Sequence, residues 1–100
     1  MREYELYLVI EATADEEAVA SIREKMAQLI ATNHKGETGE MIKEDSRGKR
    51  RLTYPIKRQT ESQDIILTFR APQLALKEME RVLKLDEKVL RYLIVRKDEV

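Results

Sequence analysis

The residue types best suited to chemistry gather in one cationic segment, residues 46–58, which holds six bases and no acid. Residues 1–45 hold 5 bases and 11 acids, and residues 59–100 hold 8 of each, so the net charge is zero. Lysine and arginine donate hydrogen bonds to phosphate oxygens, and arginine can hold two oxygens at once. The zero net charge argues against coating a nucleic acid by bulk attraction. The segment therefore predicts local binding to an anion, and its residue types fit RNA, DNA or an acidic protein equally.

Two tyrosines add a second chemistry to these cations. Tyr54 lies inside the cationic segment, and Tyr4 lies near the N-terminus. An aromatic ring can stack on an unpaired base, but it can also pack in a core or fill a surface, and for Tyr54 we favour packing. The cations also have a plainer explanation, since charged side chains keep an edge strand from pairing with another molecule. Six cations without one acid exceed what that protection needs, so we favour anion binding.

Catalysis and metal binding find little support among the remaining polar residues. His34 is the only histidine and there is no cysteine, whereas zinc and iron sites use clustered imidazoles or thiolates. The neighbouring Glu44 and Asp45 would point to opposite faces of a strand, so they form no acid–base pair. A carboxylate-only magnesium or calcium site stays open, although residues 15–17 lack the spacing of a calcium loop. We expect no enzyme activity, cofactor, metal site or small-molecule substrate.

Length and composition predict a single domain over residues 1–100. The hydrophobic fraction of 42% is enough for a core, and the charged fraction of 38% requires a charge-rich surface. The longest apolar runs are too short to span a membrane, and the first residues lack an apolar signal core. Because there is no cysteine for disulfides, we expect a cytoplasmic protein without a membrane partner.

Periodicity divides the chain into four strands and two helices. Residues 4–10 alternate between two faces, whereas Thr13 and Glu16 form a capping box before a helical apolar pattern. Pro55 cannot donate a ladder hydrogen bond, so its strand belongs at a sheet edge. Residues 46–48 fit either a hairpin turn or a bulge, and we favour one long bent strand through them. The predicted elements are strand 4–10, helix 14–34, strand 38–56, polar loop 57–63, strand 64–70, helix 72–84 and strand 89–96.

This order predicts an α+β fold of the ferredoxin-like, split βαβ type (βαββαβ). Right-handed crossovers place both helices on one face of a four-stranded antiparallel sheet, with strands 4–10 and 64–70 in its centre. Alternation predicts that Leu52 and Ile56 anchor the long strand to the core. Lys49 and Arg51 would then point across the other face of the sheet.

The sheet face that no helix covers, here called the open face, is expected to be unusually apolar. Its predicted members are Tyr7, Val9, Ile66 and, from the last strand, either Leu93 with Val95 or Tyr92 with Ile94. Contiguous exposed apolar area marks a protein interface, whereas scattered apolar residues on a surface carry no such meaning. We favour a protein partner on this face.

Three segments of the chain resemble the bacterial small-subunit ribosomal protein six family: residues 1–5 (MREYE), 48–56 (GKRRLTYPI) and 90–96 (LRYLIVR). The middle motif of that family usually reads glycine, a basic pair, leucine, alanine, tyrosine, proline and isoleucine. This chain departs from it at Thr53, where alanine is common, and residues 64–66 lack the aromatics often seen there. The resemblance implies the same ferredoxin-like fold.

The resemblance also implies a structural constituent of the small ribosomal subunit. Such a protein would bind the central domain of small-subunit ribosomal RNA as a heterodimer with small-subunit ribosomal protein eighteen. The residues expected to meet the RNA are Arg2, Tyr4, Arg50, Arg51, Tyr54, Lys57, Arg91, Arg96 and Lys97. The alternative is a ferredoxin-like protein–protein adaptor whose basic strand contacts an acidic protein.

Overall fold

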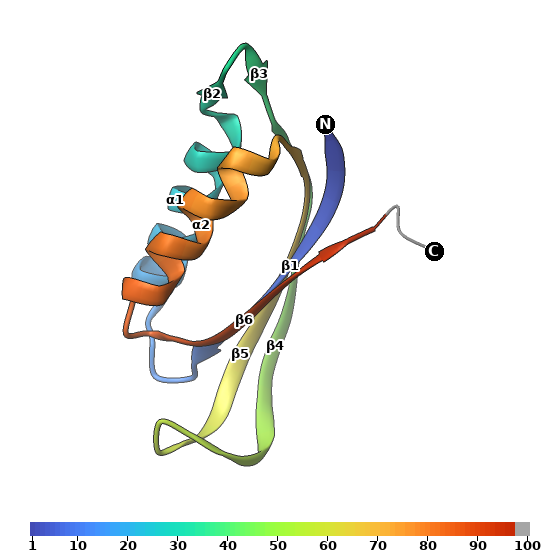
Figure 1. Ribbon diagram of the computed structural model, residues 1–100. Coiled ribbons are helices and arrows are strands. Elements are labelled where there is room, and N and C mark those ends of the chain that lie inside the picture. The colour runs from blue at the N-terminus through green and yellow to red at the C-terminus, as the bar shows by residue number, and fades with distance from the viewer. Residues whose placement is uncertain (98–100) are drawn as a thin grey trace.

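The computed structural model describes residues 1–97 and contains one main four-stranded sheet and two helices. The elements are β1 (Arg2–Glu11), α1 (Glu16–Ala31), β2 (Asn33–His34), β3 (Glu37–Thr38), β4 (Glu40–Ile56), β5 (Gln59–Ala71), α2 (Gln73–Leu85) and β6 (Val89–Arg96). The main sheet has the order β4-β5-β1-β6, and every neighbouring pair is antiparallel. Both helices lie on one side of it (Figure 1). The predicted α+β, ferredoxin-like fold with β1 and β5 in the centre is confirmed.

The hydrophobic core lies between the main sheet and the two helices. Alternate residues of the central strands point into it, and Leu6 and Phe69 are completely buried there. Burial of each large apolar side chain contributes about 1.5–3 kcal/mol to folding, so this layer fixes the central strands. The helices supply Val19, Ile22, Met26 and Ile30 from α1, and Ala75, Met79 and Leu83 from α2.

Helix α1 is shorter than predicted at both ends. Asp15 caps it instead of Thr13, because the Asp15 carboxylate accepts a 2.8 Å hydrogen bond from the Ala18 amide. The helix ends at Ala31, since residues 33–38 form the small hairpin of β2 and β3. That hairpin, absent from the prediction, carries the chain from the helical layer back to the sheet.

Gly39 makes the return to the sheet possible. A Cβ at this position would lie 2.6 Å from the carbonyl oxygen of Ile30 and closer still to that of Arg70. The Gly39 amide donates to the same Ile30 oxygen at 3.0 Å. Only glycine fits a passage this close to two backbone segments, and β4 starts directly after it.

Strand β4 is one long bent strand at a sheet edge, as predicted. Its pairing with β5 shifts register near Met41, between Ser46 and Gly48, and between Arg51 and Ile56. Gly48 has a φ of +74°, a conformation that glycine adopts without strain. Residues 46–48 therefore form a bulge within the strand and not a hairpin turn.

The polar loop predicted at residues 57–63 is wrong, because β5 begins at Gln59. Lys57 and Arg58 alone join the two strands, and their φ values of 49° and 66° are both positive. Two such residues are typical of a type I′ turn, whose twist matches the flanking strands. The hairpin projects beyond the helices (Figure 1), so residues 59–61 extend as strand without an apolar face.

Candidate RNA and protein interface

The cationic segment forms the outer arm and the turn of the β4–β5 hairpin. Its bases are all exposed: Arg47, Lys49, Arg50, Arg51, Lys57 and Arg58. Arg47 Nε lies 3.4 Å from Asp45 Oδ2, an ion pair between two partly exposed side chains. Arg50 Nε lies 2.8 Å from Oδ2 of the buried Asp64. The hairpin therefore presents a cationic surface. One of its cations, Arg50, pairs with a buried acid.

Arg91 on β6 joins the cationic segment in space. It pairs with Val9 in the β1–β6 ladder, near the point where the hairpin tip approaches β6. Lys57 Nζ donates a 3.3 Å hydrogen bond to the Val89 carbonyl oxygen, which holds the tip there. Arg50 and Arg91 line one open pocket of about 210 Å³. The structure thus brings Arg91 of β6 close to two predicted cations of the hairpin, Arg50 and Lys57.

Residues 52–55 leave the ladder as a wide bulge. Arg51 pairs with Glu61 and Ile56 pairs with Gln59, so these residues face Thr60 alone. Pro55 needs no ladder hydrogen bond in this position, which removes its usual cost in a strand. Tyr54 is 62% exposed in the bulge, so its ring is accessible from solvent.

The prediction that Leu52 and Ile56 anchor β4 to the core is wrong. Both are half-buried outside the core, and they line the open pocket with Arg50. This part of the hairpin projects past the helices, so no core lies beneath it (Figure 1). Arg50 lies on the open face, where it pairs with Asp64, although simple alternation placed it on the anchoring side. Lys49 lines a pocket on the open face with Tyr7 and Ile66, as predicted.

The prediction that Tyr4 stacks on a base is also wrong. Tyr4 is 6% exposed and belongs to the core. Its ring centroid lies 5.7 Å from that of Phe69, with the two rings tilted by 30°. A ring buried in this way stabilises the sheet and is not accessible to RNA.

The remaining predicted cations lie at the opposite end of the sheet from the hairpin: Arg2, Arg96 and Lys97. Arg96 pairs with Tyr4 and Arg91 pairs with Val9, so the two positions are five residue steps apart along β1. That separation is about 17 Å along a strand. The structure therefore divides the predicted RNA-binding residues into a hairpin group and a distant group, with Tyr4 in neither.

Strand β6 contributes exposed apolar side chains to the open face. Leu93 is 63% exposed and Val95 is 45% exposed. Tyr92 and Ile94 pack against the core instead, which decides between the two predicted sets. An apolar patch at this edge of the sheet is the kind of surface that a protein partner covers.

The three open-face residues predicted from β1 and β5 differ in accessibility. Tyr7 and Ile66 are half-buried, so each offers part of its surface. Val9 is only 3% exposed, and it lines the open pocket between Arg50 and Arg91. Val9 therefore forms a pocket floor and contributes little exposed area of its own.

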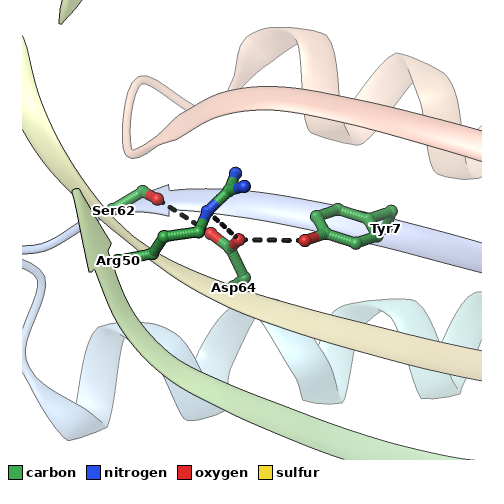
Figure 2. A network of polar contacts seen from close by, with 4 residues as sticks. All are labelled: Tyr7, Arg50, Ser62 and Asp64. Atoms are coloured by element: carbon green, nitrogen blue, oxygen red, sulfur yellow. Dashed lines mark hydrogen bonds and ion pairs between the residues drawn. The ribbon is translucent and has the colours of Figure 1, made fainter. Parts of the chain in front are cut away.

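A buried carboxylate lies on the open face, within reach of three different side chains (Figure 2). Asp64 is 1% exposed, and its Oδ1 accepts a 2.8 Å hydrogen bond from Ser62 Oγ. Its Oδ2 accepts a 3.0 Å hydrogen bond from the Tyr7 hydroxyl and pairs with Arg50 Nε. A buried charge is tolerated when it is paired and hydrogen-bonded in this way. Sequence reasoning missed this network because it depends on strand register.

The network raises the pKa of Tyr7 above its ordinary value of 10.0. Burial of the phenol is the largest cause, followed by its hydrogen bond to Asp64 and the negative charge of that carboxylate. The positive charges of Arg50 and Arg47 act in the opposite direction. Tyr7 is therefore a neutral hydrogen-bond donor to Asp64 throughout the physiological pH range.

Residues 1–97 contain neither a cluster of metal ligands nor a membrane-spanning helix. No three or more histidine, cysteine, aspartate or glutamate residues in this range gather into a group that could hold a metal ion. His34 lies in strand β2 and is half-buried. None of the helices in the same range has the length and apolar character needed to cross a membrane.

The chain matches one known family over almost its whole length. The sequence model of ribosomal protein S6 matches residues 3–96. Small ribosomal subunit protein bS6 of Heliobacterium modesticaldum is 36% identical over 99% of both chains. The same protein of Clostridioides difficile is 37% identical over 95% of this chain and 98% of its own.

A solved structure shows the same fold. The crystal structure of 30S ribosomal protein S6 from Thermotoga maritima matches with a TM-score of 0.83 and 25% sequence identity. The match covers 96% of this chain and 87% of that one. The chain therefore belongs to the ribosomal protein S6 family, whose members are structural components of the small ribosomal subunit in the cytoplasm and not enzymes.

Proposed function

We propose that this chain binds the central domain of small-subunit ribosomal RNA jointly with small-subunit ribosomal protein eighteen. The supporting observation is that two different surfaces adjoin at Arg91. One is the exposed hairpin with its acid-free cationic segment, and the other is the open face with exposed Leu93 and Val95. Cationic surfaces suit phosphates and apolar surfaces suit proteins, so one small domain can engage both partners at once.

The proposed RNA contacts lie at the two ends of the sheet, and all are exposed except the half-buried Arg96. The hairpin group is Arg51, Tyr54, Lys57 and Arg91, and the distant group is Arg2, Arg96 and Lys97. Each lysine or arginine that neutralises a phosphate releases counterions, so log affinity falls with log salt. About four such contacts correspond to a slope of about −3. Arg50 is left out of both groups, because it pairs with Asp64 on the open face, the surface proposed for the protein partner.

The proposed surface for protein eighteen is the open face. Its exposed members on β6 lie beside the half-buried Tyr7 and Ile66, and together they form one side of the sheet. Apolar area removed from water contributes about 25 cal/mol per Å². A partner that covers this face therefore gains binding energy that RNA, with its polar backbone, does not.

The test is binding of an RNA fragment of the central domain to this chain alone, to protein eighteen alone, and to both. We expect binding to tighten by at least about tenfold with both proteins, within the usual range of coupling energies. Leu93→Asp should abolish this gain, whereas Leu85→Asp, at a 75% exposed position of α2, should not. Equal RNA affinity with and without protein eighteen would contradict joint binding.

A further inference from the structure

We infer that Asp64 is a positioning residue, which holds Arg50 on the open face as a receptor for a carboxylate of the protein partner. The inference rests on the proposed function, in that a protein partner covers the open face. The two side chains differ sharply in accessibility: Asp64 is 1% exposed and Arg50 is 53% exposed. The buried Asp64 therefore holds the Nε side of the Arg50 guanidinium, while the rest of that group remains accessible.

The geometry leaves most of the guanidinium donors open. Arg50 Nε is the nitrogen that lies 2.8 Å from Asp64 Oδ2. In Figure 2 the two terminal nitrogens of Arg50 point away from that carboxylate. A guanidinium presents its N–H groups as a planar fork, which matches the two oxygens of a carboxylate.

Asp64 itself has little freedom to move. Ser62 Oγ donates to its Oδ1 at 2.8 Å, and the Tyr7 hydroxyl donates to its Oδ2 at 3.0 Å. Ser62 is completely buried, so these contacts fix the carboxylate from the side of the sheet. Fixing a donor before binding lowers the entropy cost of binding, which is the advantage of a preorganised receptor.

The surroundings of Arg50 favour an acidic protein side chain over RNA. Arg50 and Arg91 also line a second open pocket, again of about 210 Å³, which lies on the open face and is lined by no acidic residue. The same pocket is lined by Tyr7, Val9 and Leu93, so an anion entering it meets apolar surface as well as two guanidiniums. An aspartate or glutamate flanked by apolar residues fits that combination, whereas a phosphate brings a polar sugar chain.

The test measures affinity for purified protein eighteen by isothermal titration calorimetry, and affinity for the RNA fragment in a separate titration. The variants are Asp64→Asn, Arg50→Lys, Arg50→Gln and the control Glu40→Gln. The control is matched because Glu40 also pairs with an arginine across the same two strands, at 3.5 Å from Arg70. Thermal unfolding followed by circular dichroism verifies that each variant folds.

We expect Asp64→Asn and Arg50→Lys each to weaken protein eighteen binding about tenfold, and Arg50→Gln to weaken it more. Arg50→Lys distinguishes the effect of the oriented guanidinium from the effect of positive charge alone, because lysine keeps the charge but lacks the fork that Asp64 orients. Glu40→Gln should bind as the unchanged chain does. If Asp64→Asn fails to fold, the two substitutions at the exposed Arg50 still decide the outcome.

Three outcomes would overturn the inference. If both Arg50 variants bind protein eighteen as tightly as the unchanged chain, the receptor is absent and the proposed function still stands. If the Arg50 variants lose RNA affinity and keep protein affinity, the anion is a phosphate. If the unchanged chain binds no protein eighteen, the proposed function itself fails and the inference fails with it.

Discussion

The guanidinium of Arg50 and the carboxylate of Asp64 lie 2.8 Å apart, although one is exposed on β4 and the other is buried on β5. The pair connects the cationic hairpin to the open face proposed for the protein partner. Asp64 pairs in the ladder with Gly48, where β4 bulges. The local shape of the edge strand therefore sets where the Arg50 side chain lies.

Replacing Asp64 by alanine should lower the free energy of unfolding by about 2–3 kcal/mol. The substitution leaves the buried hydroxyl of Ser62 without its acceptor and removes the partner of Tyr7 and Arg50. Urea denaturation measures the loss. The control Glu40→Ala breaks an exposed ion pair with Arg70 and should cost less than about 0.5 kcal/mol. Equal losses in the two variants would contradict a structural role for the buried carboxylate.

Tyr7 should ionise above pH 10.0, because burial and Asp64 both disfavour its phenolate. A raised folded-state pKa means that the folded chain retains this proton more tightly than the unfolded chain. The stabilising contribution of Tyr7 is therefore complete below pH 10.0 and is lost as the pH rises through the folded-state pKa. Absorbance titration of the phenolate, with Tyr7→Phe as the reference, reports the midpoint. Asp64→Asn should lower that midpoint, and an unchanged midpoint would exclude Asp64 as a cause.

Gly39→Ala should destabilise the fold by about 3 kcal/mol, because the new methyl group would overlap two backbone carbonyls. Gly48→Ala meets no atom within 4 Å, so only its positive φ matters there. That conformation costs about 1–2 kcal/mol for a residue with a side chain. Chemical denaturation of both variants gives the two values. A larger loss at Gly48 than at Gly39 would contradict the close passage described here.

Arg58→Gly should raise the free energy of unfolding by about 0.5 kcal/mol, because glycine relieves the positive φ of 66° at the hairpin turn. The gain is small, since glycine also loses more backbone freedom on folding. The control Thr60→Gly, in the extended strand next to the turn, should lower stability by about 0.5–1 kcal/mol. Thermal unfolding of the two variants distinguishes a turn effect from a general effect of glycine.

Sequence periodicity was sufficient to predict a helix or strand wherever one side of that element packs on the core and the other side faces solvent. β1 alternates because one face packs on the helices, and Pro55 indicates an edge because it lacks a donor. Periodicity failed to predict a strand where both of its sides face solvent. Residues 59–61 looked like a loop because the hairpin projects past the core and needs no apolar face. Thr13 and Asp15 are both residue types that favour a helix N-cap. The path of the chain between β1 and α1 determines that Asp15 takes this position.

The candidate site was predictable in composition but not in orientation. The acid-free run of cations is a property of the sequence, and the exposure of Tyr54 agrees with its place in a bulge. Bulges shift which face each following residue occupies, so alternation gave Arg50 and Leu52 the wrong surroundings. Asp64 could be joined to Tyr7 and Arg50 only once the register of three strands was known.

The most direct measurement of the proposed function is the salt dependence of RNA affinity in the presence of protein eighteen. We predict a slope of log affinity against log salt of about −3 for the unchanged chain. Replacing Arg51 and Lys57 by glutamine should reduce the magnitude of that slope by about 1.5. The same change at Lys25 and Lys77, exposed on the two helices, should leave it unaltered. A slope near zero, or one that the hairpin substitutions leave unchanged, would contradict RNA binding through the cationic hairpin.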